Sequence, residues 1–140
     1  MENYPGMGIL SRKLLSKINQ NEEYEKLNKN YIFLYDKLKN NKNIFLPIVP
    51  RIDEFIVSPR FPIYVNKKIK NRLLNEFEKN NLGVGLWFDR IPKYLSKMSI
   101  ANLAETSKAN EMIINIPIHA AITFDELDLY VNILNNINDK

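Results

Sequence analysis

The stretch of sequence that decides the fold lies near the C-terminus and reads Ala109-Asn-Glu-Met-Ile-Ile-Asn-Ile-Pro-Ile-His-Ala-Ala-Ile-Thr-Phe-Asp-Glu-Leu-Asp-Leu-Tyr-Val131. Its apolar run at 113–116 predicts a short β-strand, because β-branched residues favour the pleated backbone. Thr123 and Glu126 have the spacing of a capping box, in which each side chain bonds the backbone N–H of the other residue. We therefore expect a final helix to begin here. The residues on its inner face are Leu127, Tyr130, Leu134 and Ile137.

Two amphipathic patterns lie upstream of this stretch. Apolar residues recur at three- and four-residue spacing over 24–38, which predicts the clearest helix of the chain. We expect Asn19 to cap this helix in a capping box with Glu22, and Asn40-Asn41 to take the left-handed backbone at its end. A second helix is expected after Asn66. Its inner face carries Ile69, Leu73, Leu74 and Phe77, and Asn80-Asn81-Leu82-Gly83 ends it.

Shorter segments complete the expected order of elements. Helices are predicted at 9–18 and around 103–112, and strands at 43–47 and 84–88. Residues 55–65 are rich in β-forming side chains, but Pro59 and Pro62 lack the N–H that a central strand requires. We therefore expect this strand at an edge of the sheet, or with a bulge before Ile63.

The order of these elements predicts an α+β fold. A long N-terminal helix comes first, and a small, mostly antiparallel sheet with helices packed on one face follows. The chain has 140 residues, of which 45% are apolar and 26% charged. These values are typical of one globular domain with a core of its own.

Composition excludes several classes of site. The chain has no cysteine and one histidine, which excludes disulfides, thiolate nucleophiles, and zinc sites built from several cysteines or histidines. No apolar run approaches the roughly 18 residues of a membrane span, and no signal peptide is recognised, so we expect a soluble, cytoplasmic domain. The net charge is +4, but the lysines are scattered among glutamates, so we do not expect a nucleic-acid surface.

Few local clusters suggest chemistry. His119 follows a predicted strand without a nearby carboxylate partner, and we interpret it as a structural residue rather than a general base. The first turns of the final helix carry several carboxylates, which the helix dipole favours without any catalytic role. Trp87, Asp89 and Arg90 leave a predicted strand together and enter a loop, where binding residues often gather. They are equally compatible with a half-buried tryptophan beside an ordinary turn.

The sequence resembles the C-terminal region of the DegT/DnrJ family, the pyridoxal-phosphate (PLP) aminotransferases of sugar biosynthesis, which have the aspartate-aminotransferase fold. The most specific match is the segment 109–131, which is similar to the family's tail with its Leu-Pro-x-His motif and capping box. The segment Tyr24 to Leu38 is similar to the helix that leaves the family's large domain, and Phe77 to Val84 to its helix ending in Gly-Ile.

The resemblance implies that residues 1–40 are a connecting helical region at the end of a large domain and that residues 41–140 are a small C-terminal domain. It implies PLP as the cofactor of a full-length parent, and no PLP site in this chain, because no segment resembles the family's cofactor-binding lysine motif. It also implies that Trp87, Asp89 and Arg90 lie on the side of a nucleotide-sugar substrate. The implied partners are a large PLP-binding domain or subunit and a second copy of the chain.

The sequence leaves three competing functional hypotheses. The first is the small domain of an aminotransferase for keto-sugar nucleotides in cell-surface polysaccharide or aminosugar biosynthesis, inactive when isolated. The second is a non-catalytic interaction module that uses the amphipathic helix at 24–38, whose apolar stripe would be exposed. The third is a small basic nucleic-acid binder, whose binding would depend on salt.

Overall fold

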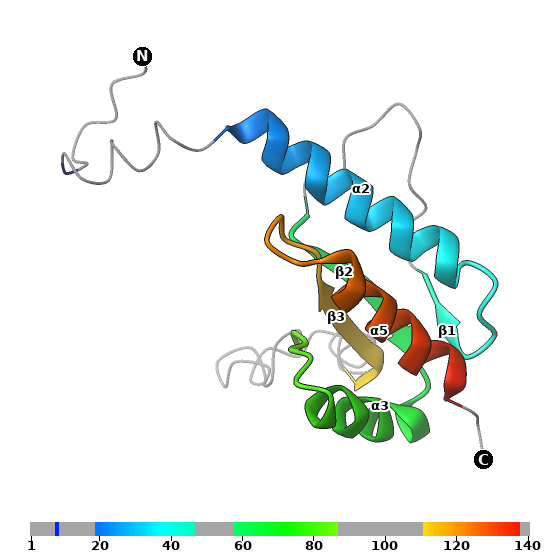
Figure 1. Ribbon diagram of the computed structural model, residues 1–140. Helices are drawn as coiled ribbons and strands as arrows, with labels where there is room; N and C mark the ends of the chain where they lie inside the picture. Colours follow the sequence, from blue (N-terminus) through cyan, green and yellow to red (C-terminus); the bar gives the residue numbers. More distant parts are fainter. Residues whose placement is uncertain (1–7, 9–18, 47–57, 87–110, 138–140) are drawn as a thin grey trace, which may run out of the picture.

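The computed structural model describes residues 8, 19–46, 58–86 and 111–137. The described elements follow the order expected for an α+β fold (Figure 1). They are α2 (Gln20–Leu38), β1 (Ile44–Phe45), β2 (Arg60–Val65), α3 (Lys67–Lys79), β3 (Ile113–Pro117) and α5 (Phe124–Asn136). None of the described helices is long and apolar enough to cross a membrane.

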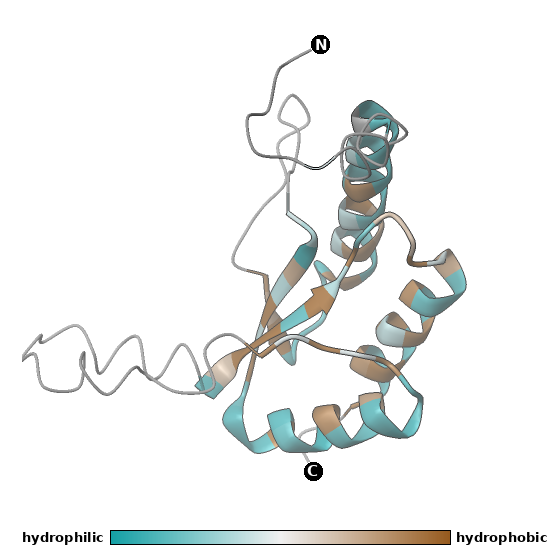
Figure 2. Ribbon diagram, turned by 90° about the vertical axis from the view of Figure 1, so that its left-hand side faces the viewer, coloured by the Kyte–Doolittle hydropathy of each residue, from teal (hydrophilic) through white to brown (hydrophobic). Residues whose placement is uncertain are grey.

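The three strands form an antiparallel sheet in the order β1-β2-β3. Side chains alternate between its two faces, so strand register separates them. The first face carries Phe61, Ile63, Val65, Ile114 and Ile116, which share one core with the helices. We call the opposite side the second face, and it carries Arg60, Pro62, Tyr64, Ile113, Asn115 and Pro117. All three helices lie on the first face, as predicted, and Figure 2 shows them together on one side of the strands.

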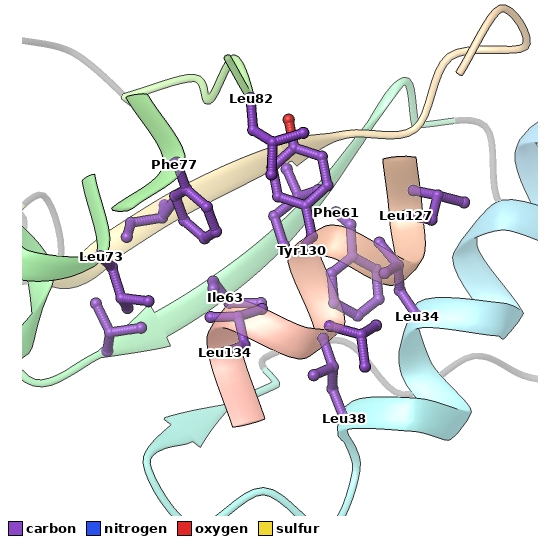
Figure 3. Packing of buried hydrophobic residues seen from close by; sticks show 14 of the residues in the cluster. Leu34, Leu38, Phe61, Ile63, Leu73, Phe77, Leu82, Leu127, Tyr130 and Leu134 are labelled. Carbon is purple, nitrogen blue, oxygen red and sulfur yellow. The ribbon is translucent and has the colours of Figure 1, made fainter. Parts of the chain in front are cut away.

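The core lies between this first face and the helices (Figure 3). Tyr31 of α2 meets Phe61 of β2 with ring centroids 4.7 Å apart, and Phe77 of α3 meets Tyr130 of α5 at 5.3 Å. Most inner-face residues predicted from helical periodicity are buried, including all four of α5. Leu27 and Tyr35 of α2 and Leu74 of α3 are partly buried, and Tyr24 of α2 is 39% exposed.

The two C-terminal helices begin as predicted. Thr123 accepts from the Glu126 N–H at 3.2 Å, while the Glu126 carboxylate accepts from the Thr123 N–H at 2.8 Å, so the capping box is complete. The side chain of Asn66 caps α3 by accepting from the Lys68 N–H at 3.0 Å. Both caps are local in sequence, which explains why residue spacing alone predicted them.

The ends of α2 differ from the prediction. Asn19 is the N-cap residue, but its amide donates to the Glu22 carboxylate at 2.8 Å and makes no bond to the backbone, so the capping box is wrong. Among the described residues only Asn81, directly after α3, has a positive φ outside glycine, so the left-handed Asn40-Asn41 is also wrong. The Asn41 amide instead donates to the Leu134 carbonyl of α5 at 3.0 Å.

The strand containing Pro62 is central and pairs with β3 in an uninterrupted register, so the predicted edge position and the alternative of a bulge before Ile63 are both wrong. Pro62 lies opposite Asn115, whose N–H and C=O both bond Gly85 on the far side of β3. The pair therefore has no hydrogen bonds of its own, and the missing N–H of proline points away from β3. On its other side, the described part of β1 pairs with Tyr64 and Val65.

Several predicted elements fall wholly or partly outside the described residues. These are the helix at 9–18, most of the helix at 103–112 and the end of the strand at 84–88. In the described part of that last segment, Gly85 forms a single antiparallel bridge with Asn115 rather than a strand.

Candidate functional site

The predicted substrate-side residues Trp87, Asp89 and Arg90 lie outside the described residues. The segment that leads to them, from the end of α3 to Leu86, is described. It runs along the edge of β3 opposite β2, with Leu82 in the core, and its contacts define the candidate site.

The first anchor of this segment is Tyr130 of α5. Its hydroxyl donates a hydrogen bond to the main-chain carbonyl of Gly83, 47 residues away in the chain. The ring is 2% exposed, and burial raises the pKa of Tyr130 to about 12, so the hydroxyl keeps its proton at neutral pH. The last helix therefore fixes the turn that follows α3.

The second anchor is a pair of backbone hydrogen bonds between Gly85 and Asn115. The Gly85 N–H donates to the Asn115 carbonyl at 2.8 Å, and the Asn115 N–H donates back at 2.9 Å. This bridge extends the sheet by one residue beyond β3. It places the Gly85 Cα next to the Asn115 side chain on the second face.

Gly85 is also covered by an arginine. A Cβ at position 85 would stand 2.5 Å from an Nη atom of Arg60 and 3.5 Å from the Cβ of Asn115. Any larger residue would displace the guanidinium, because such a contact is shorter than van der Waals distance. The Ser58 hydroxyl donates to the Arg60 carbonyl at 2.7 Å and fixes the start of β2 beneath this side chain.

Asn115 is the unusual residue of the site. It is 2% exposed, and its Nδ2 finds no acceptor within the part of the chain that the structure describes. A buried amide donor without a partner costs free energy, roughly 1–3 kcal/mol. Neither Arg60 nor Asn115 was predicted as a site residue, because they come from strands more than 50 positions apart and share no motif.

His119 lies at the turn into the capping box, the position expected from the sequence. Its main-chain carbonyl accepts from the Ile122 N–H at 3.0 Å, and its exposed ring has no hydrogen-bond partner among the described residues. The Glu126 carboxyl has a lowered pKa, chiefly because of its bonds from Thr123 and to a smaller extent because of His119. Among the described residues, the groups that follow His119 are those of a helix cap.

A hollow of about 590 Å³ lies between α3 and α5. Its lining is rich in asparagine, with Ile133 and Leu129 at its apolar side. The charged pair Glu76 and Lys79 at its edge is bonded internally at 2.7 Å. The one carboxylate among these lining residues is thus already paired with a lysine.

The described residues do not fit PLP. That cofactor requires a lysine for its aldehyde, a group for its ring nitrogen and a cradle for its phosphate. No described lysine is buried, and Lys39, Lys67 and Lys79 each pair with a carboxylate. The pKa of Lys39 is raised by its bond to Asp36, which is opposite to the lowering that makes a lysine nucleophilic.

Comparison with known proteins identifies the fold. No protein-family model matches the chain, and no curated protein sequence matches it. The aminotransferase TlmJ from Streptoalloteichus hindustanus superposes with a TM-score of 0.73 at 9% identity, over 89% of this chain and 33% of that one. A DegT DnrJ EryC1 StrS aminotransferase from Brucella abortus gives 0.74 at 13% identity, over 94% of this chain and 35% of that one.

A third match is PseC from Helicobacter pylori, an aminotransferase involved in the biosynthesis of pseudoaminic acid. It gives a TM-score of 0.70 at 16% identity, over 89% of this chain and 34% of that one. The chain thus has the fold of about a third of these aminotransferases, which agrees with the small domain expected from the sequence. At these identities the likeness is one of fold.

Proposed function

We propose that this chain is the small domain of a PLP-dependent aminotransferase that acts on keto-sugar nucleotides. The observation that carries the proposal is the superposition of 94% of the chain on a third of a DegT DnrJ EryC1 StrS aminotransferase. In this proposal a large domain or subunit supplies the cofactor and the reacting lysine. The small domain supplies a rigid wall beside the substrate.

The site geometry supports this role for the segment after α3. The bond from Tyr130 to Gly83 and the bridge from Gly85 to Asn115 fix its first residues against the core. Residues that follow a fixed segment can be placed with little loss of entropy on binding. In this proposal Trp87, Asp89 and Arg90 contact the nucleotide sugar.

The first test is a PLP titration of the purified chain, with borohydride reduction and mass spectrometry of the product. The proposal expects no internal-aldimine absorbance and no lysine with a specific adduct. Lysozyme or another basic protein of similar size is the control for non-specific reduction. A single lysine modified in full at stoichiometric PLP would show that this chain carries its own active site, which would overturn the proposal.

The second test asks for the large domain directly. The tagged chain is expected to co-purify with a protein that carries a reducible PLP-lysine, and the pair is expected to transaminate a keto-sugar nucleotide. Each component alone should be inactive. Full activity of the partner without this chain would contradict the proposed role.

A specific observation favours the non-catalytic alternative enough to test it. On α2, Tyr24 and Ile32 remain 39% and 41% exposed, so part of this helix presents apolar surface. An interaction module that uses this helix predicts self-association, which Tyr24→Ser and Ile32→Ser together would abolish. A monodisperse monomer by light scattering would count against this alternative.

A further inference from the structure

Two side chains converge on Gly85 from different strands. The guanidinium of Arg60 and the Cβ of Asn115 both lie within 3.5 Å of the point where a Cβ on Gly85 would stand. They reach this point on the second face, because the register places Arg60 opposite Pro117 and Asn115 opposite Pro62. The absence of a side chain at position 85 leaves the room in which they meet.

Both groups are hydrogen-bond donors, and the described residues provide neither with an acceptor. A guanidinium offers five N–H donors and no acceptor, and the Asn115 Nδ2 offers two more. Within the described segments no carboxylate pairs with Arg60, and the Asn115 Nδ2 has no hydrogen-bond partner. Asn115 is nevertheless only 2% exposed. Proteins rarely bury a donor in this way without a ligand or another function.

We propose that Arg60 and Asn115 form a binding site for a carboxylate group. A carboxylate has two coplanar oxygens and is the acceptor that a guanidinium binds in a bidentate manner. One oxygen would accept from Arg60 and the other from Arg60 and Asn115 Nδ2 together. Arg60 is itself exposed, so its side chain can move aside to admit the ligand and then close over it.

The backbone around Asn115 is fixed by the sheet. Asn115 is held on one side by both hydrogen bonds to Gly85, and Pro62 faces it on the other without any ladder bond. The side chain therefore projects from a fixed piece of sheet. Binding then requires only Arg60 to be ordered, which keeps the entropic cost of binding low.

The test is an NMR titration of the ¹⁵N-labelled chain with sodium acetate, compared with sodium chloride at equal ionic strength. The side-chain amide of Asn115 and the Nε–H of Arg60 are expected to shift together and to saturate with acetate only. Arg60→Gln is expected to weaken binding by about tenfold or more, because the charge-assisted bonds are lost. Lys68→Gln removes the same charge from an exposed position on α3 and is expected to leave binding within about twofold, as charge pairs at a distance are screened.

Asn115→Asp gives a second and independent readout. It places a carboxylate beside Arg60 within the chain itself. This variant is therefore expected to melt at or above the wild-type temperature at pH 7 and to show no binding of acetate. Asn115→Leu removes the donor and is also expected to show no binding of acetate. Three results would overturn the proposal: equal shifts with acetate and chloride, equal losses in Arg60→Gln and Lys68→Gln, or normal acetate binding by Asn115→Asp.

Phosphate serves as the third probe. A tetrahedral anion that binds more tightly than acetate would refute the carboxylate assignment. The source of the carboxylate is distinguished by repeating the titration on the complex with a large domain. A free acid would still bind there, whereas an acidic side chain of the partner would exclude acetate.

Discussion

The hydroxyl of Tyr130 donates to the carbonyl of Gly83 and thereby joins the last helix to the turn after α3. The bond crosses 47 residues of sequence and involves a ring that lies in the core against Phe77. It makes the position of the following segment depend on the packing of α5. The same bond gives the first two testable consequences.

Tyr130→Phe is expected to destabilise the chain by about 0.5–1.5 kcal/mol, the usual net contribution of one hydrogen bond. The ring and its packing are retained, so the change isolates the hydroxyl. Urea unfolding followed by circular dichroism measures the difference. Tyr64→Phe is the matched control, since the described residues give its hydroxyl no hydrogen bond, and its effect should stay within about 0.5 kcal/mol.

The pH dependence of stability has a definite sign. Burial raises the pKa of Tyr130 to about 12 from an ordinary value near 10. Its contribution is therefore fully present below pH 10, and stability falls as the pH rises from about 10 to 12, because only the unfolded state releases the proton. Tyr31 behaves in the same way, also by burial. The free energy of unfolding should fall less steeply in Tyr130→Phe than in the wild type, and equal slopes would contradict this assignment.

The three helix caps should differ in how much they contribute to the free energy of unfolding. Thr123→Ala breaks a complete capping box, and Asn66→Ala removes a real bond to the Lys68 N–H, so each is expected to cost about 1 kcal/mol. Asn19→Ala should cost less than half as much, because its side chain makes no bond to the backbone. Chemical denaturation of the three variants checks the ranking. An Asn19→Ala variant as unstable as Thr123→Ala would show that the predicted capping box at α2 forms in solution.

Gly85→Ala should be folded but should move Arg60. The new methyl group would stand 2.5 Å from the guanidinium, which is the far end of a long side chain and can swing away. We expect a stability change within about 1 kcal/mol and a loss of acetate binding. Gly83→Ala is the control, since nothing lies within 4 Å of its added Cβ. Unchanged acetate affinity in Gly85→Ala would show that Arg60 does not take part in binding the carboxylate.

The proposed substrate-side residues can be tested in the complex with a large domain. Arg90→Gln and Trp87→Ala are expected to raise KM for the nucleotide sugar by about tenfold each with little change in kcat, if they bind substrate without acting on it. Asp89→Asn should have a smaller effect of the same kind. The melting temperature of the isolated chain is measured in parallel. A fall in stability without a change in KM would assign these residues to the core instead.

Sequence reasoning succeeded where structure is set by neighbours in the chain. Thr123 and Glu126 are three residues apart, so their capping box follows from spacing alone. The inner faces of α3 and α5 follow from helical periodicity in the same way. These are short-range effects, and they were sufficient for the fold class.

Sequence reasoning failed where the structure depends on contacts with a segment distant in the chain. Pro62 was expected at an edge, but the bridge from Gly85 to Asn115 removes the need for its N–H. The same bridge brings Arg60, Gly85 and Asn115 together from three separate parts of the chain. No spacing rule connects such residues, because only the sheet register makes them neighbours.

The packing of α2 against α5 has a consequence for how the chain is made. Leu34 and Leu38 of α2 share a core with Leu127 and Leu134 of α5, and Asn41 donates to the Leu134 carbonyl 93 residues later. These contacts cannot form until synthesis has passed α5, about 90 residues after α2. The apolar side of α2 therefore stays exposed until α5 has been synthesised. Premature termination before α5 should therefore yield an aggregating product rather than a smaller folded one.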